Sequence, residues 1–303
     1  MFLPNAADGS GLTIGYQSGK TRLNLSGYGS EVFLLSEAVS GLGYPDIEHQ
    51  ESTHAGVHGA MWRGWNAKPR EITLPLVVSS NGDDDESRDG FIGSWDTVTR
   101  CFHPGEEGTL SVTTPSGSTR TIGCRCVGID DSFTVDPVNR GYAVVSVKLM
   151  AFDPFWRGAA SSVSWSNRGG VDWLGGGPLD KPGTAFPIVL MPGGNQGQAL
   201  LENVGDLPSW PVWTIRGPVD SFTISVDDAR VSYKGGLDEG ETMVIDSDPR
   251  TQRVDWDGVD AFMLLDSWEF RPIDKATAAK VKVKIKGQGD VTATTQPMFL
   301  AAW

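Results

Sequence analysis

Two of the four histidines have a spacing that occurs in metal sites. His54 and His58 are four residues apart, which on a helix places both imidazoles on one face, as in zinc proteases. The intervening segment contains Gly56, however, and lacks the adjacent glutamate that acts as the base in those enzymes. We therefore expect these histidines in a loop or an interface and predict no metal site; His49 and His103 offer no better pattern.

Acidic residues alternate along a segment that precedes an apolar one. Asp83, Asp85, Ser87 and Asp89 occupy every second position, like the oxygen ligands at the start of a calcium-binding loop. Arg88 stands where such a loop has its sharp-turn glycine, and no glutamate closes the segment at the required distance. Because carboxylates are stabilising at the N-terminal end of a helix, we expect this run to begin one, with calcium binding as the alternative.

The three cysteines form no CxxC pair. An odd number without paired spacing argues against a disulfide framework and fits a reducing compartment. In the segment TIGCRCVGI, the side chains of Ile122, Cys124 and Cys126 would share one face of a strand, because alternate strand residues point to the same side. We expect these thiols, with Cys101, to fill a core and not to bind zinc, which needs further ligands.

The sequence contains no recognised catalytic signature. A nucleophile elbow, a phosphate-binding loop and a dinucleotide glycine fingerprint are all absent from it. Carboxylate pairs such as Asp227 with Asp228 and Asp255 with Asp257 are adjacent only in sequence, which does not set the separation that glycoside hydrolysis requires. We therefore predict no catalytic, cofactor-binding or metal-binding residues, and a protein that is not an enzyme.

Eleven tryptophans raise the possibility of a carbohydrate-binding face. Trp210, Trp213, Trp256 and Trp268 lie inside or beside segments that we predict as strands. A small β-domain needs large apolar residues for its core, so we expect them in the core or in a subunit interface. A carbohydrate-binding module that contacts a cell wall remains the alternative.

The net charge of −13 and the pI near 4.7 limit the possible partners. Tight binding to nucleic acid or to an anionic membrane needs a basic surface. Lys282, Lys284 and Lys286 lie on one face of a predicted strand, and we interpret them as a solvated face that protects a sheet edge. With no long apolar run and no basic or apolar export signal at the N-terminus, we expect no membrane association and synthesis in the cytoplasm.

The elements that hold these residues are mainly strands. The 303 residues suffice for two domains, and 38 glycines with 18 prolines favour short strands and turns. The pattern predicts hairpins over 12–35, a long irregular loop over 36–68 that is ordered by itself or by a partner, and one helix from Phe91 to Phe102 that ends before Pro104-Gly105. Further strands are predicted over 71–78, with Pro75 placing that strand at an edge or a bulge, and over 110–114, 120–129 and 142–152.

The pattern of the C-terminal half predicts only β-strands and turns. Residues 159–199 are rich in Gly, Ser and Pro, and we expect a covering arm followed by the first strands of a second domain. The stretch LENVGDLPSWPVWTIRGPV predicts a turn and then a half-buried strand, in which Trp213 and Ile215 alternate with polar residues. Alternating strands separated by turns every eight to twelve residues then indicate a β-sandwich.

The order of several segments resembles the distal tail proteins, or Dit proteins, of long-tailed bacteriophages. The segments are GVHGAMWRG followed by KPREITLPLVV, the helix ending at CFHPGEEGTLSV, the strand running into AFDPFW, and ENVGDLPSWPVWTIRGPV followed by GETMVIDSDPRTQRV. The resemblance covers essentially the full chain. It implies a mainly β protein with an α+β belt domain over 1–157 and a galectin-like β-sandwich over 158–303. Near the C-terminus, Pro272 and Lys275 depart from the Pro-Gly turn that is usual in the family.

The resemblance also implies a function and a set of partners. Dit proteins form a hexameric ring that joins the tail tube to the tail tip hub, with the tape measure protein and later DNA passing through its centre. This chain would then be a structural protein of the virion, made in the host cytoplasm, and without cofactors. No large insertion like those that bind carbohydrate in longer relatives is present, so we expect a scaffold role. An acidic channel would let DNA pass without specific binding.

Overall fold

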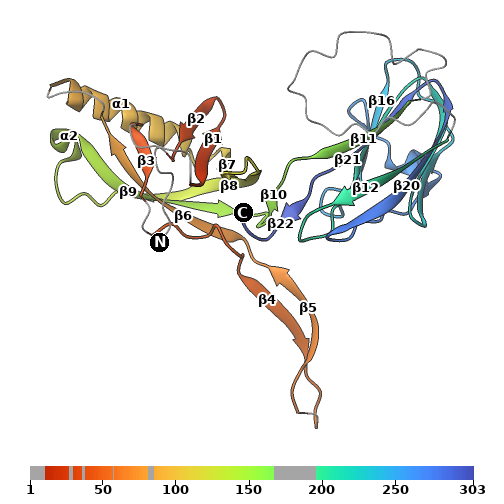
Figure 1. Cartoon of the computed structure of the whole chain (residues 1–303), viewed down its shortest axis with the longest axis horizontal. Helices are drawn as coiled ribbons and strands as arrows, with labels where there is room; N and C mark the ends of the chain where they lie inside the picture. The colour runs from red at the N-terminus through yellow and green to blue at the C-terminus, as the bar shows by residue number, and fades with distance from the viewer. Residues whose placement is uncertain (1–10, 27–29, 36–37, 57, 81–84, 167–195) are drawn as a thin grey trace. The chain divides into compact units, whose positions relative to one another are not determined.

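A computed structural model describes residues 11–26, 30–35, 38–56, 58–80, 85–166 and 196–303. The chain divides into two compact units, of which the first comprises Met1–Gly158 with Phe299–Trp303 and the second Ala159–Met298 (Figure 1). The sequence assigned everything from residue 158 onward to one domain. The structure instead groups the last five residues with the first unit, because Ala302 and Phe299 pack in that unit's core.

The first unit is built on one nine-stranded sheet. Its main path runs in the order β2-β1-β7-β8-β9-β6-β3, and all the strand pairs along it are antiparallel. Two short strands, β10 and β22, join it beside β8. The bounds are β1 Thr13–Ser18, β2 Thr21–Asn24, β3 Val32–Leu34, β6 Arg70–Ser79, β7 Glu107–Thr113, β8 Thr119–Asp130, β9 Tyr142–Ala151, β10 Trp156–Arg157 and β22 Met298–Phe299.

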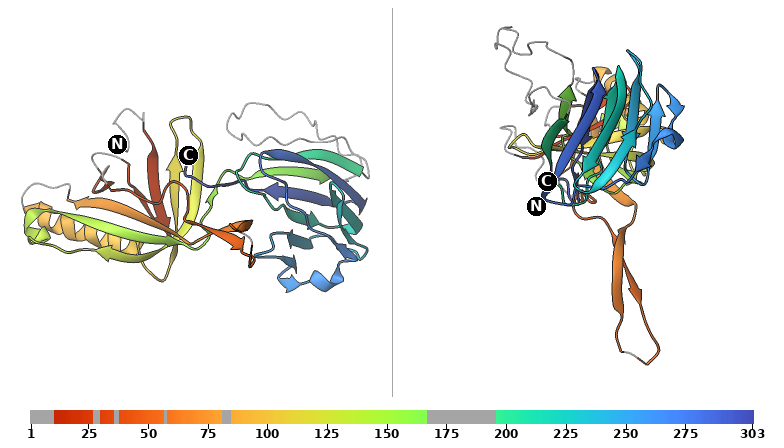
Figure 2. Two further views of the ribbon diagram at one scale, coloured as in Figure 1. Left: turned by 90° about the horizontal axis from the view of Figure 1, so that it is seen from below. Right: turned by 90° about the vertical axis from the view of Figure 1, so that its right-hand side faces the viewer.

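One face of this sheet carries the core. In β9, Val145, Val147 and Leu149 are buried while the residues between them face outward, as period-2 alternation predicts. The helix α1 (Asp85–Cys101) lies along this sheet, as Figures 1 and 2 show. Its side chains Phe91, Val98 and Cys101 belong to the core of the first unit. A second helix, α2 (Pro137–Arg140), spans a single turn. The predicted helix and the strands after it are therefore present.

Pro75 lies neither in an edge strand nor at a bulge, so that prediction was wrong. β6 pairs along its whole length with β9 and also pairs with the short edge strand β3. The Pro75 carbonyl accepts a hydrogen bond from the Leu35 amide at 2.8 Å, so its nitrogen also points to the β3 side. Because β3 ends at Leu34, the missing donor falls where the pairing stops.

The second unit contains two sheets that share one hydrophobic core, which gives the predicted sandwich. The six-stranded sheet has the order β11-β21-β13-β16-β17-β18, and the five-stranded sheet has the order β12-β20-β14-β15-β19. The bounds are β11 Ser161–Ser166, β12 Gln196–Asn203, β13 Val212–Arg216, β14 Val219–Val226, β15 Ala229–Tyr233, β16 Thr242–Asp246, β17 Arg253–Trp256, β18 Val259–Asp260, the 3-10 helix η1 Phe262–Leu264, β19 Ser267–Trp268, β20 Thr277–Gly287 and β21 Asp290–Thr295.

The turn between β12 and β13 is organised by one buried asparagine. The Asn203 side-chain amide donates to the carbonyls of Leu207 and Ile273 at 2.8 and 3.0 Å, and its oxygen accepts from the Gly205 amide at 2.9 Å. These bonds satisfy backbone groups that the irregular segment would otherwise leave unpaired. Trp213 and Ile215 then enter the core of the sandwich, as the alternation predicted.

Candidate interaction surfaces

A β-hairpin projects from the first unit where the sequence predicted an irregular loop. The strands β4 (Ile47–Ser52) and β5 (Met61–Ala67) pair only with each other, and Figure 1 shows them leaving the nine-stranded sheet. We call residues 46–68 the arm. The prediction of an irregular loop was wrong because neither face of the arm is buried in the sheet's core, so its sequence shows no apolar alternation.

The surface of the arm is unusually apolar for an exposed element. Trp62 is 65% exposed and Met61 is 53% exposed. A few side-chain contacts across the hairpin hold it in register, among them a 3.2 Å hydrogen bond from Trp62 Nε1 to His49 Nδ1. A two-stranded hairpin alone is only marginally stable in water, and aromatic and methionine side chains are enriched in protein interfaces. The arm is therefore a candidate surface for a partner.

A buried arginine anchors the base of the arm. Arg70, the first residue of β6, is 2% exposed and has no carboxylate partner among the described residues. Its guanidinium donates to four carbonyl groups: those of Pro154 and Gly41 at 2.8 Å, that of Leu300 at 2.7 Å, and that of Gly43. Loss of solvation lowers the pKa of Arg70 to about 10. This one side chain fixes three chain segments at the root of the arm.

The histidines considered for metal binding do not form a site. His54 and His58 lie in the turn of the arm, are exposed, and are not on a helix. Among the described residues, no three His, Cys, Asp or Glu side chains gather as a metal cluster. For the calcium alternative, Asp83 lies outside the described residues, whereas the backbone from Asp85 onward is already helical.

The cysteines fill the core of the first unit, as the sequence predicted. Cys101, Cys124 and Cys126 are all buried and unpaired. Burial raises the pKa of the Cys101 thiol to about 11 and that of Cys124 to about 12, because an apolar environment disfavours the thiolate. Neutral thiols of this kind serve packing and offer no nucleophile.

The carboxylate pairs serve turns. Asp255 Oδ1 accepts from the Gly258 amide at 3.0 Å, and Asp257 Oδ1 accepts from the Thr242 amide at 3.2 Å. Asp227 has a positive φ of 49° and accepts from the Lys280 amide at 3.1 Å. Aspartate commonly occupies such turn positions because its short side chain bonds the nearby backbone.

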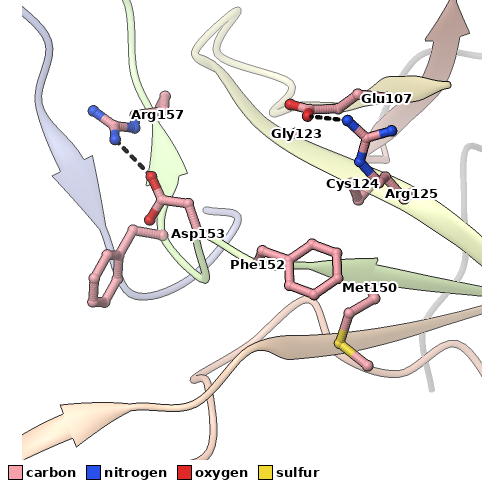
Figure 3. A pocket seen from close by; sticks show the side chains of 9 residues that line it. Glu107, Gly123, Cys124, Arg125, Met150, Phe152, Asp153 and Arg157 are labelled. Atoms are coloured by element: carbon pink, nitrogen blue, oxygen red, sulfur yellow. Dashed lines mark hydrogen bonds and ion pairs between the residues drawn. The ribbon is translucent and has the colours of Figure 1, made fainter. Parts of the chain in front are cut away.

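One cavity in the first unit contains charged groups, and Figure 3 shows them. It has a volume of about 330 Å³. Arg157 contacts Asp153 at 2.6 Å and Arg125 contacts Glu107 at 3.2 Å, with the 67% exposed Phe152 between the two ion pairs. Each of these carboxylates is paired with a guanidinium, so the cavity presents no pair of free carboxylates for acid–base catalysis.

The tryptophans of the second unit are divided between core and surface. Trp213 is 1% exposed and stacks with Trp165, with ring centroids 6.4 Å apart. Trp256 is half-buried against Tyr233, and only Trp268 of the predicted set has a largely exposed ring. The sequence-based expectation of core residues thus holds for Trp213.

Structure comparison relates this fold to phage proteins. The crystal structure of SPP1 Dit, described as a paradigm of the hub adsorption apparatus in phages that infect Gram-positive bacteria, superposes with a TM-score of 0.60 at 13% identity. The match covers 94% of this chain and 99% of that chain. The chain has the Dit fold. A component of the phage P2 baseplate in its activated conformation with Ca matches with a TM-score of 0.50 at 10% identity, over 94% of this chain and 98% of that one.

The Dit fold confirms the resemblance that the order of the sequence segments indicated. Searches with the sequence alone did not find this relationship. No family model and no curated protein sequence matches the chain. None of the helices in the described residues has the length and hydrophobicity to cross a bilayer. At 10–13% identity, the shared fold extends over 94% of this chain and over 98–99% of the two phage chains.

Proposed function

We propose that this chain is a structural protein of a bacteriophage tail tip and that six copies form a ring there. The observation that carries the proposal is the end-to-end match with SPP1 Dit, which leaves neither protein with a large unmatched domain. A fold can be shared by proteins of different function, so the proposal also needs support from this chain's own surface. The arm supplies it.

The arm suits assembly into a closed ring. A ring of identical subunits uses a heterologous interface, in which each copy offers two different patches. The arm would be the first patch, since it extends from the sheet and presents Trp62, Met61 and Ile47 to a neighbour. Aromatic and methionine side chains are enriched in the buried centres of such interfaces. In this role a neighbouring copy buries the apolar side chains of the arm that are exposed in the single chain.

The proposed ring would connect the tail tube to the tip hub. Its partners would be further copies of the chain, the tail tube protein, the hub protein and the tape measure protein, with DNA passing through the channel. The net charge of −13 favours passage of DNA without binding. In this role the protein needs no cofactor and no catalytic residue.

Electron microscopy of the purified protein tests the proposal directly. We expect sixfold rings at concentrations of tens of micromolar or in the virion itself. A protein that stays monomeric in solution and is absent from purified particles would overturn the assignment.

Two variants separate the arm's role from general surface hydrophobicity. Met61→Ser with Trp62→Ser removes exposed apolar side chains of the arm and one bond across the hairpin. We expect it to abolish rings while changing the free energy of unfolding of the first unit by less than about 1 kcal/mol, because no residue of β4 or β5 belongs to that unit's core. Met263→Ser with Leu264→Ser is the control, since it removes two exposed apolar side chains of η1 in the second unit. Rings that persist in the first variant would contradict the role of the arm, and loss of rings in the control would show that it is not specific.

A further inference from the structure

Four lysines form a row on one face of the second unit. The chain has ten lysines, and four of them occupy alternate positions of β20, where all four are exposed. The residues between them are buried in the sandwich core. We call Lys280, Lys282, Lys284 and Lys286 the lysine row.

The lysine row lies in the middle of a sheet and not at its edge, so the edge-protecting interpretation was wrong. β20 pairs with β12 on one side and β14 on the other. Lys282 is flanked by Gln198 and Ser225, and Thr223 lies beside Lys284. At Lys282 and Lys284 both sides of the strand are paired, so these charges protect no free backbone groups. The row therefore calls for another explanation.

The row is also largely uncompensated. None of its four ammonium groups forms an ion pair within the described residues. On the two flanking strands, as far as the structure describes them, carboxylates occur only near the ends of the row: Asp227 bonds the Lys280 amide, Glu202 lies opposite Ala278, and Asp220 sits at a bulge beside Lys286. Alternate residues of a strand are roughly 6.7 Å apart. Like charges at that distance repel one another, so this acidic chain concentrates positive charge at some cost.

We propose that the lysine row binds a linear polymer of phosphodiester groups joined by short flexible linkers, of the kind that a bacterial surface presents. The assignment of the polymer to the bacterial surface rests on the proposed function; the ligand chemistry does not. An extended row of point charges matches a chain with regularly recurring anionic groups. Ammonium groups bind phosphate as point charges without the planar geometry that arginine brings to carboxylates.

The neighbours of the row argue for this class of ligand over two others. The residues paired with the lysines on β12 and β14 are Gln, Ser, Thr and Leu, and none is aromatic. Single-stranded nucleic acid and neutral sugars are usually held by stacking on aromatic rings. The hydroxyl groups of Ser221, Thr223 and Ser225 instead lie beside the row and can donate to phosphate oxygens. A flexible phosphodiester chain without rings fits this face.

Fluorescence anisotropy with a labelled propanediol phosphodiester oligomer tests the proposal, using the full-length protein. We expect binding that weakens as salt rises. Lys282→Gln with Lys284→Gln should weaken binding by roughly tenfold or more at low salt. The same variant should reduce the slope of log affinity against log salt by about 1.4, since each neutralised charge contributes about 0.7 for a single strand.

The control variant Lys20→Gln with Lys148→Gln removes the same charge from exposed positions of the first unit and should bind as the wild type does. Equal loss in both variants, or no loss in the row variant, would overturn the site. Tighter binding of an oligothymidylate of equal phosphate number would assign the face to nucleic acid, and tighter binding of a polyglutamate of equal charge would assign it to an acidic protein. Because ring formation is measured separately by microscopy, failure of the site does not imply failure of the proposed function.

Discussion

At the scale of single residues, Arg70 shows how a buried charge can be retained without an ion pair. Its guanidinium is surrounded by carbonyl oxygens from segments that are far apart in the sequence. The lowered pKa reports the cost of removing this cation from water. The hydrogen bonds to these carbonyls offset part of that cost, because they replace the water that the guanidinium loses. No pattern in the sequence marks this arginine among the others, since the carbonyls it joins come from loops.

Replacing Arg70 should destabilise the first unit strongly. Arg70→Leu leaves four carbonyl acceptors without their donor, and each buried acceptor left unpaired costs about 1–3 kcal/mol. We expect a total loss of about 3–5 kcal/mol, below the simple sum because water can enter the vacated space. Guanidinium denaturation followed by tryptophan fluorescence measures it. The control is Arg125→Leu, which breaks an exposed ion pair with Glu107 and should cost less than about 1 kcal/mol. Similar losses in both variants would contradict this account.

The buried thiols predict how stability depends on alkaline pH. An unfolded chain releases its thiol protons near pH 9, whereas native Cys101 and Cys124 hold theirs until about pH 11 and 12. The unfolded state therefore binds fewer protons above pH 9, so the stability that the thiols contribute is complete below pH 9 and is lost as the pH rises toward 11. Unfolding free energies measured from pH 8 to 10.5 should fall, and should fall less in Cys101→Ala with Cys124→Ala. An identical slope in that variant would exclude the thiols as the cause.

At the scale of elements, burial on one face decided what could be predicted. The helix that packs through Phe91 and Val98, and strands such as β9, carry strong periodic patterns because each has one buried and one exposed face. The arm has no such pattern, since both of its faces are exposed. If a neighbouring copy covers the arm, its apolar side chains become buried only in the assembly. The hydrophobic pattern within one chain therefore does not reveal the arm as a hairpin.

Strand position within a sheet was harder to predict than the strands themselves. Alternation identified β6 and β20 as strands, but both were assigned to edges, β6 because of Pro75 and β20 because of its lysines. In each case a local rule was applied without knowledge of the neighbours. The end of β3 accommodates Pro75, whereas Lys282 and Lys284 of β20 have paired strands on both sides. The lysine row became a candidate site only once the pairing was known.

At the scale of the whole molecule, the chain leaves the first unit at Gly158 and returns to it at Phe299. The returning segment is short and has no hydrophobic period, so no pattern in the sequence separates it from the sandwich. In the structure, the Arg120 guanidinium lies 3.6 Å from the centre of the Phe299 ring and donates to the Ala301 carbonyl at 2.9 Å. Ala302 is fully buried, and its amide donates to the Leu42 carbonyl.

Deleting residues 299–303 should therefore weaken the first unit and leave the second intact. The deletion removes a buried alanine, a cation–π contact worth about 0.5–2 kcal/mol and the Leu300 carbonyl that accepts from Arg70. We expect a loss of about 2–4 kcal/mol, which lowers the melting temperature of a unit of this size by roughly 5–15 °C. Calorimetry should show one transition shifted and the other unchanged. Truncation after Ala302, which removes only the half-exposed Trp303, is the control and should leave both transitions in place. An equal shift of both transitions in the five-residue deletion would mean that the segment does not belong to the first unit alone.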